Sequence, residues 1–156
     1  DLHPTITGIA GRKGFSVISI EKAMMNSELG FGRKVLQAFE ENSVSFEHLP
    51  TGIDTLCVVV SGEVFAPKRD IILSRIVHET NPDTITVYDN MSIIATVGRG
   101  MVHNCGTAAR LFAAMSKAGI NVRMIDQGSS ELSIIVGVND ADYESTIQAI
   151  YNAFVK

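Results

Sequence analysis

The sequence predicts an α+β fold of two tandem βαββαβ domains, each an antiparallel sheet with its helices on one face. The first supporting observation is an internal repeat, in which residues 16–62 superpose on residues 92–138 without a gap at an offset of 76 positions. The second is that each copy alternates short β-rich apolar runs with segments of helical periodicity. The third is that the first helix of each copy opens at a glycine, Gly30 or Gly106.

The first copy contains all the elements that the fold requires. Its strands are expected at residues 15–20, 44–49, 55–61 and 84–88, where apolar and β-branched residues cluster. Its helices begin at Gly30 and near Pro67, a residue that is tolerated in a first turn. The side chains expected to face inward from the second helix are Ile71, Ile72, Ile76 and Val77.

The second copy is one strand short. Its strands are expected at residues 92–97, 120–126 and 131–138, and its second helix near Asp140, with Ile147, Ile150, Tyr151 and Phe154 facing inward. Residues 5–10 have strand character and no place in the first copy, so we expect them to complete the second domain. The first domain is then residues 14–90, and the second is residues 1–13 together with 91–156.

Composition excludes several classes of function. The formal charge is −4 and the basic residues are scattered, so nucleic acid is not an expected partner. No apolar stretch is long enough to cross a bilayer, which predicts a protein that does not enter the membrane. Cys57 and Cys105 show no zinc-ligand spacing, and two unpaired thiols suit the reducing cytoplasm. The chain has no initiating Met, so we expect a piece of a longer protein.

Catalytic motifs are weak, and we predict no catalytic residue, metal or cofactor in this chain. Gly8, Gly11 and Gly14 could form an anion-binding loop, but they lack a phosphate-loop register, and a flexible turn between domains is the favoured interpretation. Cys105 at a helix start, with His103 nearby, could act as a nucleophile, although a packed loop is favoured. The remaining histidines, His3, His48 and His78, have no metal-ligand spacing and are expected to be structural or at the surface.

A binding site for a zwitterion is the strongest chemical hypothesis. Backbone N–H groups at a glycine-opened helix suit a carboxylate, and Glu47 and Asp54 could meet an ammonium group. Together these groups fit an amino acid. The spacing alone leaves open the alternative that Gly30 only permits close packing and that the two acids are solvated.

Two sequence strings in the first copy, GFGRKVL (30–36) and SFEHLPTGID (45–54), resemble the first ACT domain of a bacterial monofunctional aspartokinase. Two more in the second copy, HNCGTA (103–108) and MIDQGSSE (124–131), resemble its second ACT domain. The likeness covers essentially the whole chain. It implies two ferredoxin-like ACT domains that form a non-catalytic regulatory region. The kinase domain, which uses ATP and Mg²⁺ to phosphorylate aspartate, would form the N-terminal part of the parent chain.

The resemblance also implies a site and partners. End-product amino acids bind between paired first ACT domains in this family, so we expect a homodimer and an effector, lysine first and threonine second. Carried onto this sequence, the effector-binding residues are Met25, Gly30, Phe31, Gly32, Ser45, Phe46, Glu47, Thr51, Gly52, Ile53 and Asp54. A second effector site or a packing region is implied at Gln127, Ser129 and Ser130. The competing hypothesis is a structural dimerisation module that binds no ligand.

Overall fold

The computed structural model describes residues 6–98, 105–127 and 133–155. The chain divides into two compact units. We call Gly14–Asn90 the central unit, and Asp1–Lys13 with Met91–Lys156 the flanking unit. Two long strands, β1 (Gly8–Glu21) and β4 (Thr84–Val97), contribute to both units because the boundary crosses each of them.

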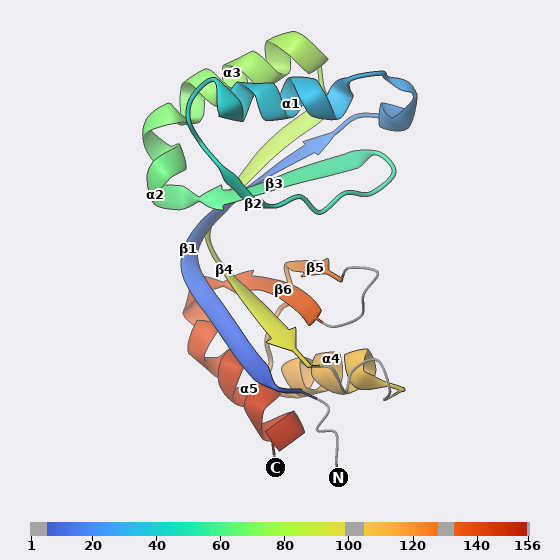
Figure 1. Ribbon diagram of the computed structural model, residues 1–156, viewed down its shortest axis with the longest axis vertical. Coiled ribbons are helices and arrows are strands. Elements are labelled where there is room, and N and C mark those ends of the chain that lie inside the picture. The colour runs from blue at the N-terminus through green and yellow to red at the C-terminus, as the bar shows by residue number, and fades with distance from the viewer. Residues whose placement is uncertain (1–5, 99–104, 128–132, 156) are drawn as a thin grey trace. The chain divides into compact units, whose positions relative to one another are not determined.

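The central unit has the element order of a βαββαβ domain (Figure 1). After β1 come η1 (Met25–Ser27), α1 (Phe31–Glu40), β2 (Phe46–His48), β3 (Thr55–Ser61), α2 (Gly62–Phe65), η2 (Ala66–Lys68), α3 (Arg69–Thr80) and β4. The strand order is β2-β3-β1-β4, and β3 runs antiparallel to both β1 and β2. This is the predicted split-βαβ sheet, and β3 has the predicted bounds.

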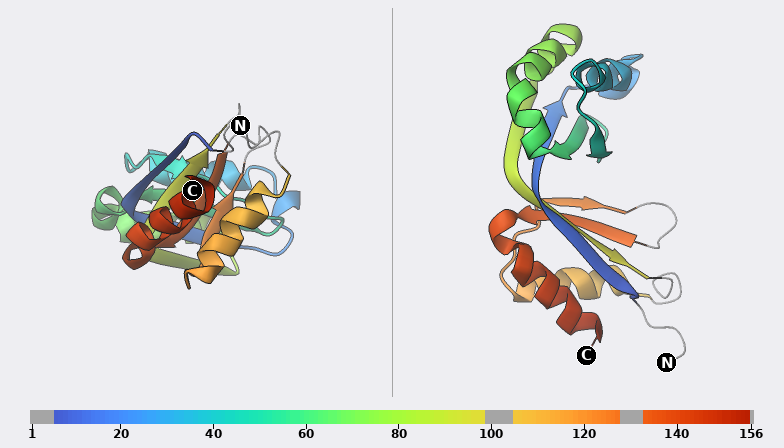
Figure 2. Two further views of the ribbon diagram at one scale, coloured as in Figure 1. Left: turned by 90° about the horizontal axis from the view of Figure 1, so that it is seen from below. Right: turned by 60° about the vertical axis from the view of Figure 1, so that its left-hand side comes forward.

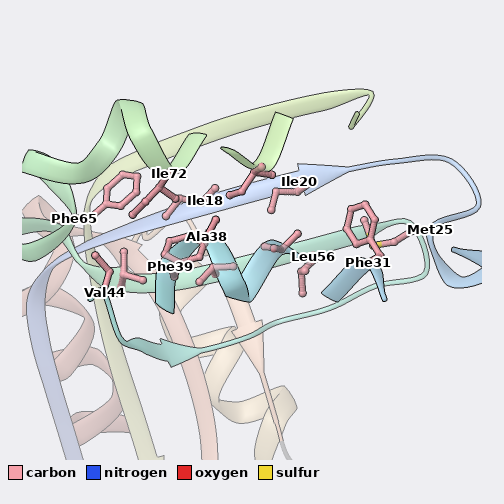
Figure 3. Close-up of a cluster of buried hydrophobic side chains, with 14 residues drawn as sticks. Ile18, Ile20, Met25, Phe31, Ala38, Phe39, Val44, Leu56, Phe65 and Ile72 are labelled. Carbon is pink, nitrogen blue, oxygen red and sulfur yellow. The ribbon is translucent and has the colours of Figure 1, made fainter. Parts of the chain in front are cut away.

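The two long helices of the central unit cover one face of its sheet (Figures 1 and 2). Apolar side chains from α1, α3 and the facing strand positions form one core, which includes Ile18, Val35, Phe39, Val58 and Ile72 (Figure 3). Each of these five side chains is at most 1% exposed. Burial on this scale is the main force that holds the unit together.

The flanking unit repeats this arrangement with other segments. Its elements are β4, α4 (Thr107–Lys117), β5 (Met124–Asp126), β6 (Ser133–Asn139), η4 (Asp140–Asp142) and α5 (Tyr143–Val155). Its strand order is β5-β6-β4-β1, so the first part of β1 occupies the fourth position. The backbone N–H of Thr7 donates to the Val97 carbonyl oxygen over 2.8 Å, just before β1 begins. A separate core, which includes Ile94, Leu111, Met115, Val136 and Ile150, fills this unit.

The turn predicted at Gly8, Gly11 and Gly14 is wrong, because all three glycines lie within β1. A side chain at position 11 would lie only 2.9 Å from the ring of Tyr143, so this glycine allows α5 to approach the strand. Gly11 therefore serves packing, and none of the three glycines interrupts the strand or forms a phosphate loop.

The prediction of inward-facing residues was right for only part of each second helix. Ile72 and Ile76 are fully buried, but Ile71 is 58% exposed and Val77 is 45% exposed. In α5, Ile150 is buried, whereas Tyr151 is 47% exposed. Adjacent residues on a helix are about 100° apart, so a pair such as Ile71 and Ile72 cannot point fully inward together.

Candidate functional site

The start of α1 has the features of an anion-binding helix terminus. Its N-cap is Gly30 at φ +78, a left-handed conformation that glycine adopts without steric cost, and no side chain caps the helix. The Phe31 N–H donates to the Glu28 carbonyl oxygen over 3.3 Å, while the first turn of a helix leaves further N–H groups for solvent or a ligand. Because the helix dipole adds positive potential there, a carboxylate suits this position.

The effector residues predicted around α1 differ in accessibility. Gly30 and Gly32 are exposed at the helix start. Met25 and Phe31 belong to the core and are buried, so their side chains support the segment from beneath (Figure 3). The Met25 and Phe31 side chains are therefore covered by the rest of the unit, and a ligand here would meet the backbone of the helix start and exposed neighbours such as Arg33.

The turn between β2 and β3 lies beside this helix start. Thr51, Gly52, Ile53 and Asp54 are all exposed. The Lys22 backbone N–H donates to the Asp54 carbonyl oxygen over 3.0 Å, and this bond joins the turn to the segment that leads into η1. These four predicted residues and the start of α1 therefore share one end of the central unit.

The other predicted residues, Ser45, Phe46 and Glu47, lie toward the opposite end of the sheet. Phe46 pairs with Val60, whereas Thr51 pairs with Leu56, so the two levels are four positions apart along β3. That is roughly 14 Å along a strand. Figure 3 shows the same separation, since Leu56 lies with Met25 and Phe31 at one end while Val44 and Phe39 lie at the other.

This separation has a direct consequence for the predicted site. Within one chain, Glu47 and Asp54 do not converge on a common point, so the sequence-based grouping of these two acids is not reproduced in a single copy. The structure brings together only the residues of the α1 start and the 51–54 turn.

A charged cluster beneath the α1 start was missed by the sequence analysis. The Lys22 ammonium lies 2.8 Å from a Glu28 carboxylate oxygen and donates to the Thr80 carbonyl oxygen. It also lies 5.9 Å from the centroid of the Phe31 ring. The available signal was a lysine two positions after the apolar run 15–20, with a glutamate six positions later and two before Gly30.

The flanking unit offers a comparable helix start but fewer described groups. α4 begins after Gly106, which takes φ +79, and its N-cap also lacks a side-chain hydrogen bond. Gln127 is exposed directly after β5, while Ser129 and Ser130 lie outside the described residues. The second effector or packing site therefore stays a prediction.

The described residues also bear on a reactive cysteine, a metal site and a membrane-spanning helix. Cys105 is exposed, but His103 lies outside the described residues, so the favoured packed loop stays a prediction and the nucleophile stays its alternative. Burial raises the pKa of the Cys57 thiol, which disfavours its reactive thiolate. Within residues 6–98, 105–127 and 133–155, no group of three His, Cys, Asp or Glu side chains could hold a metal ion. None of the helices described there is long and apolar enough to cross a membrane.

Comparison with known proteins gives consistent matches. The ACT domain family model matches residues 94–154. Aspartokinase 3 of Bacillus subtilis is 40% identical over 150 residues, which cover 96% of this chain and 33% of the relative. The crystal structure of Clostridium acetobutylicum aspartate kinase superposes with a TM-score of 0.91 at 50% identity, covering 96% of this chain and 34% of that one.

A more distant structure extends the agreement in fold. Escherichia coli aspartokinase III, in complex with lysine and aspartate, superposes with a TM-score of 0.75 at 18% identity over 99% of this chain and 34% of that one. This chain spans about a third of the length of the Bacillus subtilis and Clostridium acetobutylicum proteins. Given the two-unit fold, the ACT match and the identity that runs through nearly the whole chain, it belongs to the bacterial aspartokinase family, of which it is the regulatory, ACT-domain part.

Proposed function

We propose that this chain senses an end-product amino acid, lysine as first choice and threonine as second, and thereby inhibits the phosphorylation of the aspartate β-carboxylate by its parent protein. ATP and Mg²⁺ act, under this proposal, in the part of the parent outside this chain, and the protein works in the cytoplasm. The observation that carries the proposal is the uncapped, glycine-opened start of α1 beside the exposed 51–54 turn, in a chain of this family. The lysine in the fold-related E. coli structure supports the choice of effector.

The proposed site needs two chains. One chain supplies the carboxylate-binding backbone at the α1 start, with Thr51 to Asp54 beside it, and residues 45–47 lie roughly 14 Å away along the sheet. β2 is an edge strand and Phe46 on it is 47% exposed, so a second copy could pair there. In a symmetric dimer of this kind, Ser45, Phe46 and Glu47 of the partner would complete the site for the amino end of the effector.

Thermal unfolding with each proteinogenic amino acid tests sensing directly. A ligand at about 100 times its dissociation constant raises stability by about 2.7 kcal/mol. We expect a selective rise in Tm with lysine or threonine, together with a dimer in analytical ultracentrifugation. An unchanged Tm with every amino acid and an unchanged dimer would instead support the structural dimerisation module.

Variants then test the site. Glu47→Ala and Asp54→Ala are each expected to raise the Kd of the effector. Glu63→Ala serves as the control, because Glu63 is an exposed acid of the same unit that lies outside the proposed site. Equal effector Kd values in all three variants and the unaltered chain would remove the site assignment.

A further inference from the structure

The Lys22 side chain contacts the start of α1 and the end of α3, the two long helices of the central unit. Its ammonium pairs with Glu28 just before α1 and lies over the Phe31 ring at the first position of α1. The same ammonium donates to the Thr80 carbonyl oxygen at the last position of α3. A cation at a helix C-terminus satisfies an unpaired carbonyl group and interacts favourably with the helix dipole.

The neighbours of Lys22 make the same connection through the backbone. The Ala23 N–H donates to a carboxylate oxygen of Asp83 over 2.8 Å, and the Asp83 N–H donates to the Glu21 carbonyl oxygen over 2.8 Å. The Lys22 N–H donates to the Asp54 carbonyl oxygen over 3.0 Å. Residues 21–23 therefore join the α1 start, the 51–54 turn and the segment between α3 and β4.

The Lys22–Glu28 ion pair is sheltered enough to help hold the segment before α1 in place. The side chains of Lys22 and Glu28 are only 23% and 30% exposed, so solvent screens the interaction less than at an open surface. By contrast, the backbone N–H groups of Met25, Ser27 and Glu28 form local hydrogen bonds, to the carbonyl oxygens of Lys22, Met24 and Met25. The Lys22 side chain and the buried Met25 thus add contacts that reach beyond this segment.

Comparison of the two copies shows that the fold does not require this lysine. At the repeat offset of 76, the position of Lys22 is occupied by Gly98. The flanking unit passes from β4 to an equivalent glycine-opened helix without a cation at that position. The lysine is therefore a feature of the copy in which we place the effector.

We propose that Lys22 is a positioning residue for the effector site of the central unit. Its ammonium holds segment 22–30 and the α1 start in register with the 51–54 turn, so that the effector carboxylate meets a preformed set of backbone N–H groups. Preorganisation of this kind strengthens binding because less order must be acquired when the ligand arrives. This inference rests on the proposed function.

The test measures effector binding to the 156-residue chain by calorimetry, about 20 °C below the Tm of each variant. We expect Lys22→Met to raise the Kd of lysine or threonine about tenfold, as loss of a charge-assisted contact suggests. Lys22→Arg retains the charge and should recover part of the affinity, and Glu28→Gln should lose affinity in the same direction as Lys22→Met. Hydrogen exchange of amides 23–30 should be faster in effector-free Lys22→Met and return toward the unaltered rate when the effector is bound.

Lys13→Met provides a matched control. Lys13 also pairs with a glutamate, Glu144 at 2.7 Å, and lies 5.3 Å from the ring centroid of Tyr143, but it belongs to the flanking unit. Its substitution should leave the Kd within about twofold. Suppose that the unaltered chain binds an effector. If Lys22→Met and Glu28→Gln bind it with the same Kd, whether or not their Tm falls, Lys22 has no positioning role. If the unaltered chain binds no amino acid, the proposed function itself fails. If Lys22→Met does not fold, Glu28→Gln alone decides the question.

Discussion

Replacement of Thr96 by valine should stabilise the flanking unit. Thr96 lies on β4 and is fully buried, and among the described residues its hydroxyl has no hydrogen-bond partner. A buried, unsatisfied polar group costs about 1–3 kcal/mol. Valine has nearly the same shape and suits a strand, and at the repeat offset the equivalent residue of the central unit is the fully buried Ile20.

We therefore expect Thr96→Val to raise the free energy of unfolding by about 1 kcal/mol or more. For a chain of this length that unfolds as one unit, the Tm should rise by about 2–4 °C. Differential scanning calorimetry measures the change and also shows whether the two units unfold together. If the flanking unit unfolds separately, its own transition should move while that of the central unit stays in place.

The matched control is Thr146→Val in the same unit. Thr146 is also fully buried, but its hydroxyl donates to the Asp142 carbonyl oxygen over 2.7 Å. The same substitution should there reduce stability by about 1 kcal/mol. Equal effects of the two substitutions, or a lower Tm for Thr96→Val, would refute the reasoning from the unsatisfied hydroxyl.

Two further predictions concern the central unit. Ile72→Ala should cost about 2–5 kcal/mol because Ile72 is fully buried, whereas Ile71→Ala should change stability by about 0.5 kcal/mol or less; urea unfolding of both variants checks the helix register. Hydrogen bonds, first from Ser16 and then from Arg69, hold the pKa of the Asp89 carboxyl below its usual 3.8. The ionised carboxylate therefore stabilises the folded state fully above about pH 3.8, and this stabilisation is lost as the pH falls through the lower pKa of the folded state. The stability difference between the unaltered chain and Asp89→Asn should accordingly shrink below about pH 4 in acid titrations followed by circular dichroism, and a constant difference down to pH 2 would contradict it.

Much of the fold could be predicted because the repeat presents each pattern of helix and strand residues twice. A glycine opening a helix at two equivalent positions is stronger evidence than either glycine alone, and both helices begin where they were expected. The glycines at 8, 11 and 14 misled for the same local reason, since glycine indicates a turn unless a neighbouring element explains it. The packing of Tyr143 against Gly11 joins residues far apart in sequence, so no local pattern could reveal it.

The candidate site was predictable only as a set of residues. The sequence strings indicated which positions matter, but the register of β3 decides that the 51–54 turn meets α1 while Glu47 lies elsewhere. Lys22 escaped notice because its partners Glu28 and Thr80 come together only when α1 and α3 pack on the same sheet. Contacts of this kind depend on tertiary structure and leave no periodic trace in the sequence.

The shared strands also set the order in which the two units can be completed during synthesis. The central unit is continuous, so Gly14–Asn90 holds every one of its elements once residue 90 has been made. The flanking unit must keep its first strand unpaired until β4 has been made, since Thr7 bonds to Val97, 90 positions later. Contacts between residues so far apart in the chain form slowly. We therefore expect the central unit to fold first. It would then hold the ends of the two flanking segments, at residues 13 and 91, close to each other while the rest is made.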